Sequence, residues 1–210
     1  MKYYYKSIFG VELAYLKINH LIQSIVQPVG DVFVNRPENF GFNYSFNLIS
    51  WLSADIVKNW HVNASLIVFH LINKGTADDQ IVNNNINSGE LEISNQFRLS
   101  KKWSAEISGL YATSHLQGQT KTEPFWHLEG GIQKMILKEK GTLKLSVNDI
   151  FHSIVRRDNT TAKNLVARRI VETDTRRIGI AFSYRFGKDT NNRKRNHNTG
   201  GAAEEQGRVN

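Results

Sequence analysis

The sequence predicts an all-β protein, because apolar and polar residues alternate through almost the whole chain. In the run 42–48, Phe, Tyr, Phe and Leu alternate with Asn, Ser and Asn. The run 178–186 repeats the pattern with Ile, Ile, Phe, Tyr and Phe at every second position. Successive side chains of a strand point to opposite faces, so each such segment has one apolar and one polar face. No segment keeps the 3.6-residue period of a helix.

The predicted strands are long, and two kinds of connection join them. We expect about eight antiparallel strands, near 3–27, 40–51, 59–73, 88–99, 102–114, 124–138, 141–151 and 174–187. Most exceed the roughly 5–6 residues of globular strands and reach the roughly 9–11 residues that cross a bilayer. Short connections alternate with long polar ones; the short ones are 52–58, 100–102 and 138–141, and the long ones are 28–39, 74–87, 115–123 and 152–173.

This arrangement is typical of an antiparallel transmembrane β-barrel, in which short periplasmic turns alternate with longer extracellular loops. Aromatic residues near the predicted strand ends point the same way. We predict five of them as interfacial aromatics: Trp51, Trp60, Trp103, Trp126 and Phe186. Corner residues of a soluble β-sandwich are the alternative. Strand length and the alternation of connections favour the membrane barrel.

The composition excludes several other classes. The 210 residues include no cysteine, which rules out a disulfide-stapled domain and a Cys-based zinc or redox site. No run approaches the roughly 18 consecutive apolar residues of a transmembrane helix. The seven histidines are scattered without metal-ligand spacing, and no nucleophile-elbow or phosphate-loop motif occurs. We therefore predict no enzyme activity, no metal site and no cofactor.

The two ends of the chain differ from its middle. The first ten residues contain no apolar stretch and no small-residue cleavage site, so we predict no signal peptide there. Residues 188–210 are polar, contain glycine and lack periodicity, which predicts a disordered tail. The expected organisation is therefore a barrel domain over 1–187 followed by a tail over 188–210.

The net charge of +8 is concentrated locally. Besides the tail, the basic excess lies in and beside the connection 152–173. Four arginines there are candidate contacts for an anionic ligand or for lipid phosphates: Arg156, Arg157, Arg168 and Arg169. A solvated loop without a specific partner is the alternative. Because the excess is local, it gives no reason to expect nucleic acid as a partner.

Three motifs occur in order in the C-terminal half of the chain, namely YATSHLQGQ (111–119), GIQK (131–134) and LKLSVNDIF (143–151). Together with the last predicted strand, IGIAFSYRFG (178–187), they resemble the C-terminal barrel portion of the outer-membrane β-barrel family related to TonB-dependent receptors. The first motif departs from the family's usual pattern, since threonine stands at position 113 where serine is common.

The resemblance implies an integral protein of the Gram-negative outer membrane that forms the barrel wall of a receptor for ligand uptake. Such receptors have a signal peptide, a plug domain and a much larger barrel. The chain is thus expected to be a C-terminal fragment without signal peptide and plug. The implied partners are outer-membrane lipid, the missing N-terminal barrel half and plug, TonB acting through the plug, and an unknown small-molecule or oligomeric nutrient ligand.

Two alternatives stay open from the sequence. A small stand-alone outer-membrane barrel with a structural or adhesive role also fits, because eight strands are enough to close a barrel. A soluble all-β domain is the third reading, and a monodisperse protein purified without detergent would favour it. For residues 1–187 alone we expect no stable membrane barrel unless they close on themselves or join a partner. Open sheet edges leave backbone groups unpaired in lipid.

Overall fold

The computed structural model describes residues 1–30, 32–77, 80–162 and 165–186, and every regular element within them is a β-strand. The predicted all-β antiparallel fold is confirmed. Among the described residues, no helix has the length and apolar character needed to span a membrane. The predicted tail, 188–210, lies outside the described residues.

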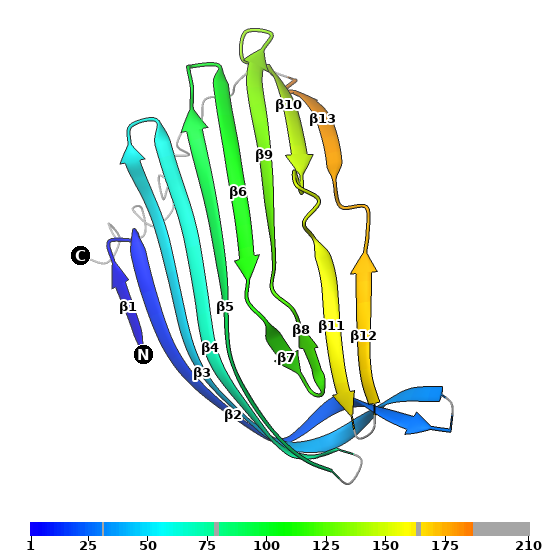
Figure 1. The fold of residues 1–210 in the computed structure, drawn as a ribbon. Coiled ribbons are helices and arrows are strands. Elements are labelled where there is room, and N and C mark those ends of the chain that lie inside the picture. The colour runs from blue at the N-terminus through cyan, green and yellow to red at the C-terminus, as the bar shows by residue number, and fades with distance from the viewer. Residues whose placement is uncertain (31, 78–79, 163–164, 187–210) are drawn as a thin grey trace, which may run out of the picture.

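The strands form two sheets (Figure 1). The main sheet has nine strands, and each neighbouring pair is antiparallel. In spatial order they are β1 (Lys2–Tyr5), β2 (Phe9–Val29), β3 (Val32–Val57), β4 (Trp60–Ala77), β5 (Gln80–Arg98), β6 (Trp103–Ala112), β9 (Phe125–Ile136), β10 (Gly141–Asn148) and β13 (Arg177–Tyr184). The second sheet contains β12 (Leu165–Glu172), β11 (Val155–Ala162), β8 (Thr120–Thr122) and β7 (His115–Gln117).

Short turns join the strands of the main sheet at one end, the upper end in Figure 1. We call this the short-turn end and the opposite one the hairpin end. Two predicted boundaries were wrong here. The predicted strand 3–27 is divided by a turn at 6–8, which adds β1 as a ninth strand. The predicted connection 52–58 belongs to β3 almost entirely, and only residues 58 and 59 separate β3 from β4.

The connections predicted as long loops are largely strands. The β2–β3 ladder continues to the pair Val29–Val32, and the β4–β5 ladder continues to Ala77–Gln80. The predicted loop 115–123 contains the β7–β8 hairpin, and the predicted loop 152–173 contains β11 and β12. In these segments apolar and polar residues do not alternate regularly, so the side chains give little periodic signal, but ladder hydrogen bonds between backbones do not require that alternation.

The long β2–β3 hairpin bends before it reaches its tip (Figure 1). Two register shifts flank Leu21: the first leaves His20 of β2 out of the ladder, and the second leaves out Phe40 of β3. His20 has a positive φ of 55°. Opposite Leu21, Gly41 has a φ of 124°, and a Cβ atom there would lie 2.6 Å from the Lys74 carbonyl oxygen. Only glycine fits both the backbone conformation and the close approach, and bulges of this kind turn a strand and increase its twist.

The bent hairpin packs against neighbouring elements at the hairpin end. The Val26 amide donates a hydrogen bond of 3.0 Å to Gln119 Oε1 in the β7–β8 turn. The side chain of Ile25 is completely buried and contacts Val82 of β5. Apart from Ile25, the buried apolar residues of the described chain are only Val62 and Ala112. The protein therefore has almost no internal apolar core, and its apolar side chains must find another apolar phase.

Candidate functional site

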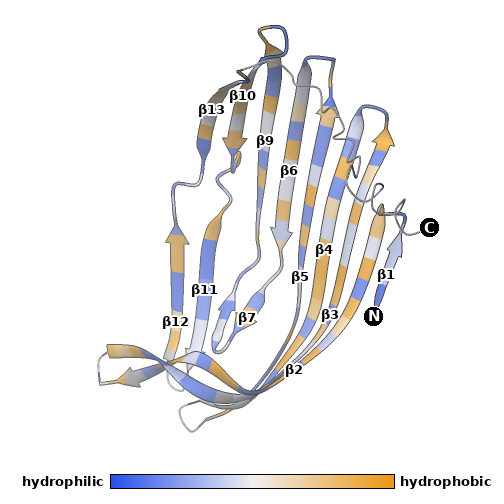
Figure 2. Ribbon diagram, turned by 180° about the vertical axis from the view of Figure 1, so that it is seen from behind, coloured by the Kyte–Doolittle hydropathy of each residue, from blue (hydrophilic) through white to orange (hydrophobic). Residues whose placement is uncertain are grey.

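The register of the main sheet aligns the apolar and polar positions of successive strands into two continuous faces. Ile107 of β6 lies opposite Gly130 of β9, which lies opposite Val147 of β10. On the other face, Ser108 lies opposite Glu129. The alternation is visible along the strands in Figure 2, where hydrophobic and hydrophilic positions follow one another. We call these surfaces the apolar face and the polar face.

The apolar face is broadly exposed. Exposed fractions are 51% for Ile107, 43% for Leu145 and 77% for Ile180, although strands on both sides flank the first two. Monomeric soluble proteins rarely expose an apolar surface that runs across a whole sheet. A lipid bilayer accepts such a surface, provided that backbone groups are paired within the sheet. The apolar face is therefore suited to contact with acyl chains.

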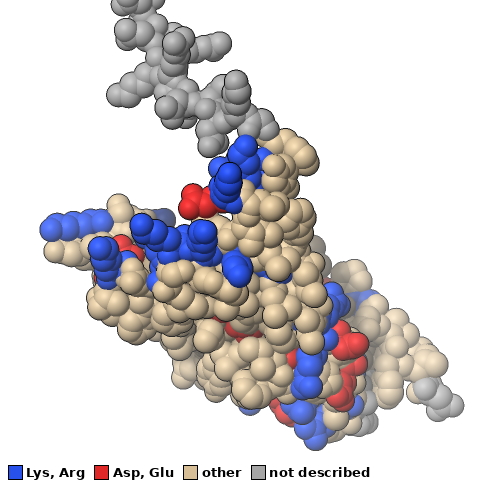
Figure 3. Space-filling model, turned by 90° about the horizontal axis from the view of Figure 1, so that it is seen from above, with Lys and Arg blue, Asp and Glu red and all other residues tan. Residues whose placement is uncertain are grey.

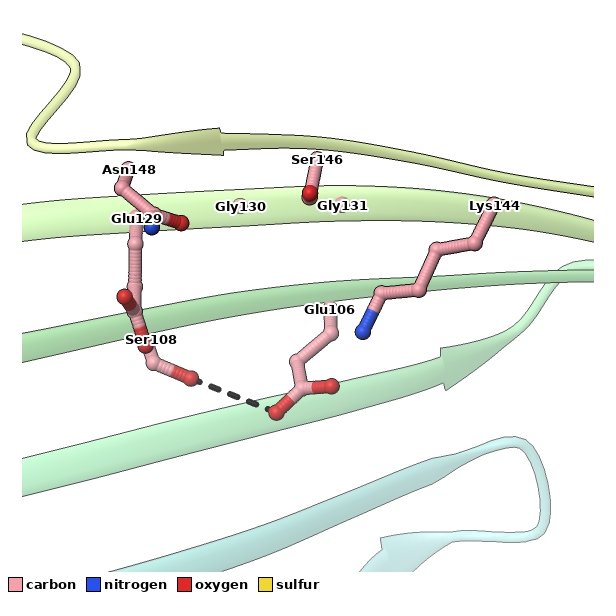
Figure 4. A pocket seen from close by; sticks show the side chains of 8 residues that line it. All are labelled: Glu106, Ser108, Glu129, Gly130, Gly131, Lys144, Ser146 and Asn148. Carbon is pink, nitrogen blue, oxygen red and sulfur yellow. Dashed lines mark hydrogen bonds between the residues drawn. The ribbon is translucent and has the colours of Figure 1, made fainter. Parts of the chain in front are cut away.

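The polar face carries charged and hydroxyl side chains at the middle of the sheet. A hollow of about 160 Å³ lies over β6, β9 and β10 (Figure 4), lined by Glu106, Ser108, Glu129, Lys144, Ser146 and Asn148 among others. Glu106 Oε1 accepts hydrogen bonds from Ser94 Oγ at 3.1 Å and from Ser108 Oγ at 3.4 Å. The Lys144 side chain extends toward Glu106 (Figure 4). Groups of both signs here require water, so this face lines an aqueous space.

A second polar cluster lies on the same face between β3 and β4. His61 Nδ1 is 2.8 Å from Asp55 Oδ1, and His61 Nε2 is 3.2 Å from Ser53 Oγ. Sequence reasoning missed this cluster because it treated the histidines singly. A register shift between Asp55 and Val57, which leaves Ile56 out of the ladder, makes Asp55 the cross-strand partner of His61, and nothing in the sequence marked that shift.

The order hydroxyl, imidazole, carboxylate is also that of a hydrolase triad. In such a triad the carboxylate is buried and orients the imidazole, whereas the Asp55 side chain is 76% exposed to solvent. Its hydrogen bond to His61 therefore competes with water. Among the described residues, no group of three or more His, Asp or Glu side chains could hold a metal ion. We interpret the cluster as polar lining of the aqueous face.

The four predicted arginine contacts lie on β11 and β12, in a structured hairpin instead of a loop. Arg156 Nε lies 3.0 Å and Arg169 Nη2 lies 2.6 Å from Asp158 Oδ2. The Asp158 side chain is almost fully buried, at 2% exposure for the residue. Burial raises the pKa of Asp158, but hydrogen bonds from Arg169, Thr122 and Arg156 outweigh it and lower the pKa to about 2.

The other two arginines face a second carboxylate. Arg168 Nη2 lies 3.1 Å from Glu123 Oε1, which also accepts a hydrogen bond of 2.9 Å from Asn159 Nδ2. The hydrogen bond from Asn159 and the nearby charges of Arg168 and Arg157 lower the pKa of Glu123. Three of the four arginines thus form ion pairs within the protein, and this pairing reduces the charge available to an external anion.

A buried carboxylate also organises the entrance to this hairpin. Asp149 is 1% exposed, and its carboxylate accepts hydrogen bonds from the Ser153 amide at 2.8 Å, the Ile154 amide at 3.3 Å and the Thr175 hydroxyl. Burial raises the pKa of Asp149, but the hydrogen bonds from Thr175, Ser153 and Ile154 outweigh it and lower the pKa to about 2. Asp149 thus links the two ends of the segment between β10 and β13, which contains the β11–β12 hairpin.

Four of the five predicted interfacial aromatics lie on the apolar face near strand ends. Trp60 stacks on Phe97, with ring centroids 5.8 Å apart. The ammonium of Lys134 lies 4.7 Å from the centroid of the Trp103 ring. Trp126 packs at 5.7 Å against the ring of Phe151, and Phe186 at 4.7 Å against Tyr184. Aromatic rings at strand ends, one of them beside a lysine ammonium, suit a membrane interface.

Trp51 lies elsewhere. It is the cross-strand partner of Gly10, and its indole covers that glycine so closely that a Cβ atom at position 10 would lie 2.4 Å from Trp51 Nε1. Its ring is 6.2 Å from that of Tyr4, which is also paired with Gly10. Its register opposite Gly10 and Ser65 places Trp51 on the polar face. Because β3 extends six residues further than expected, Trp51 also does not lie at a strand end. Trp51 therefore fills space over β2 rather than joining the other aromatics.

Basic side chains gather at the short-turn end, as Figure 3 shows from above. The turns and strand ends there carry Lys6, Lys58, Arg98, Lys101, Lys102, Lys138, Lys140 and Arg185. Among the described residues of these turns and strand ends, the acidic ones are Asp55 and Glu139. Such a ring of cations is favourable next to lipid phosphates at a membrane surface.

An antiparallel sheet with one face suited to lipid and one suited to water, ringed by interfacial aromatics, defines a transmembrane β-barrel protein. The family described as outer membrane protein beta-barrel family matches residues 1–184, so the chain belongs to that family and is an integral protein of the outer membrane. The comparison with curated proteins and the comparison with solved structures gave no match.

Proposed function

We propose that the chain forms barrel wall of a TonB-dependent type of outer-membrane receptor, through which a small-molecule or oligomeric nutrient ligand enters the cell. The observation that carries the proposal is the continuous polar face of the main sheet, which would line the lumen. A small barrel that only anchors or adheres fills its interior with its own side chains. A transport barrel instead needs a polar wall that stays open to water, because its ligand exchanges contacts with water along the way.

The family-like motifs support the proposal by their positions. The motif 111–119 ends in the β7–β8 turn, where Gln119 Oε1 accepts a hydrogen bond from the Val26 amide. The motif 143–151 includes Asp149, whose hydrogen bonds with Ser153 and Thr175 hold the two ends of the β11–β12 hairpin together. Both motifs therefore shape the hairpin end, where an extracellular ligand would first meet the protein. They are similar in order and spacing to those of TonB-linked receptors.

In this function the residues of the chain bind and orient without making or breaking covalent bonds, so no catalytic residue and no cofactor are required. Glu106, Glu129 and Lys144 keep the lumen hydrated and present charges of both signs to a ligand or to a plug domain. TonB would act on the wall only through that plug. Outer-membrane lipid would cover the apolar face.

A photo-crosslinking experiment in cells that express the full chain tests the proposal. A photoreactive amino acid at Ser108, on the polar face, should capture a plug segment, and the captured segment should change when TonB is absent. The same residue at Ile107, one position away on the apolar face, should capture lipid and no plug. Capture of lipid at both positions, or of the same soluble proteins at both, would contradict the proposal.

A further inference from the structure

Among the described strands, β1 and β13 are the two edges of the main sheet. We propose that these two edges pair with an antiparallel sheet that has an odd number of strands and is not a second copy of this chain. The inference rests on the barrel part of the proposed function and not on its transport part. It follows from strand directions, from the free backbone groups and from the side chains at the two edges.

Strand direction is the first argument. The main sheet has nine strands that alternate in direction, so its first and last strands run the same way. Both β1 and β13 run toward the short-turn end (Figure 1). Direct contact between them would therefore be parallel, whereas the strands of bacterial outer-membrane barrels are antiparallel and even in number. An odd number of intervening strands restores antiparallel pairing at both edges and makes the total even.

A second copy meets the same obstacle. Two copies with the same orientation in the membrane would offer only edges that run toward the short-turn end. Each possible seam, whether β13 with β1, β13 with β13 or β1 with β1, would then be parallel. The partner must present strands that run away from the short-turn end at both of its own edges.

The free backbone groups are identified by the bonds that already exist. The Arg185 amide donates to the Lys140 carbonyl at 2.8 Å, and ladder bonds of antiparallel strands recur at every second residue. Residues 177, 179, 181 and 183 therefore bond to β10, and the backbone N–H and C=O groups of Ile178, Ile180, Phe182 and Tyr184 point to the free edge. At the other edge, Met1 exchanges two hydrogen bonds with Leu13, which leaves the backbone groups of Lys2 and Tyr4 pointing outward.

The side chains at the β13 edge specify the chemistry of the partner. Ile178, Ile180 and Phe182 are 73%, 77% and 58% exposed, compared with 43% for Leu145 on the neighbouring inner strand. The opposite face of β13 carries the small residues Gly179, Ala181 and Ser183. A partner strand that continues both faces has apolar residues next to Ile180 and polar residues next to Ala181. It is thus an amphipathic barrel strand and not an apolar peptide.

A pair of introduced cysteines tests whether β1 and β13 lie next to each other. The chain is suited to this test because it contains no cysteine. Cysteines at Tyr3 and Ile180 lie on the two edge strands. A disulfide needs Cα atoms within about 7 Å, which adjacent strands about 4.8 Å apart allow and separated strands do not. In outer membranes of cells that express the full chain, we expect no disulfide between the two positions, either within one chain or between copies.

Proline substitutions at β13 provide the second arm. Ile180→Pro removes an outward N–H, and we expect the amount assembled in the outer membrane to fall about tenfold. Ala181→Pro removes an N–H that bonds to β10. The amount of this variant assembled in the outer membrane shows the effect of breaking a hydrogen bond within the sheet. Ile180→Ala keeps the backbone donor and should assemble at least threefold better than Ile180→Pro.

The outcomes separate the inference from the proposed function. A disulfide within one chain would show self-closure, a disulfide between copies would show a homodimeric barrel, and wild-type assembly of Ile180→Pro would show that β13 needs no partner. Each of these would overturn the inference while the chain still resides in the outer membrane. Absence of the full chain from the outer membrane would instead overturn the proposed function.

Discussion

The two halves of the main sheet continue beyond the membrane in different ways. In the N-terminal half, β2–β5 are 18 to 26 residues long, about twice what a bilayer crossing requires. The β2–β3 and β4–β5 ladders continue to the hairpin tips, with register shifts beside Leu21 in the first. In the C-terminal half, β6, β9, β10 and β13 have 8 to 12 residues and stop near the expected interface. A separate sheet then begins there, in the order β12-β11-β8-β7.

The difference shows two ways to build a projecting structure from a barrel wall. The N-terminal hairpins rely on backbone hydrogen bonds and one bend at Gly41. The C-terminal sheet relies on side chains, because its strands are short and buried carboxylates at Asp149 and Asp158 hold them. We therefore expect the C-terminal sheet to depend on single acidic residues and on pH, and the N-terminal hairpins to depend on backbone conformation.

The largest expected effect is that of Asp149→Ala. The substitution leaves the Ser153 and Ile154 amides and the Thr175 hydroxyl without their acceptor. Loss of a buried, multiply bonded carboxylate costs about 3 kcal/mol, or roughly a hundredfold in local opening. Hydrogen exchange of the full chain in detergent micelles should show this increase in β11 and β12. Asp149→Asn, which keeps one acceptor oxygen, should show a smaller one; equal exchange in all three proteins would contradict the account.

Gly41→Ala should have the next largest effect, confined to the N-terminal hairpins. The new Cβ atom would lie 2.6 Å from the Lys74 carbonyl oxygen at a φ of 124°. Strain of this kind costs about 2 kcal/mol, or roughly thirtyfold faster exchange in the bent part of β2 and β3. Gly30→Ala is the control, because Gly30 also has a positive φ but no neighbour within 4 Å of the added atom. If hydrogen exchange is equally fast in both variants, the contact with the Lys74 carbonyl oxygen is not the cause of the strain at Gly41.

Acid should open the C-terminal sheet and spare the N-terminal hairpins. The pKa of Asp158 is lowered from 3.8 to about 2, so its contribution of about 2 kcal/mol is present above pH 4 and is lost as the pH falls from about 4 to about 2. Pepsin cleavage within β11 and β12 should accelerate over that range. In Asp158→Asn cleavage should be fast already at pH 4. Equal acceleration in β2–β5 would argue against a specific carboxylate.

The smallest effect is expected from Arg168→Gln. Arg168 is an exposed partner of Glu123, and such pairs contribute less than about 1 kcal/mol. Exchange in β12 should rise less than about fivefold. Arg169→Gln should have the larger effect, because Arg169 pairs with the buried Asp158. A reversed order of the two variants would show that burial of the carboxylate does not set the strength of these pairs.

The sequence was sufficient for the fold class and for most spanning strands, because every second residue there meets lipid and the period is strong. It was insufficient at the hairpin end, where both faces of a strand are wet and the period fades. The segment 74–87 was predicted as a loop for this reason, although it continues two strands. The pairing of Asp158 with Arg169 and of Asp55 with His61 depends on cross-strand register, which a single sequence does not specify. Trp51 was grouped with the interfacial aromatics by its place near a predicted strand end, although the alternation puts position 51 on the face of Asn43 and Asn47.

The central claim is that one face of the main sheet meets lipid and the other meets water. Single spin-labelled cysteines at Ile107 and Ser108 of β6, and at Leu145 and Ser146 of β10, test it in isolated outer membranes. The account predicts that labels at 107 and 145 collide mainly with dissolved oxygen, and labels at 108 and 146 mainly with a water-soluble nickel chelate. Equal access of the chelate to all four positions would contradict it.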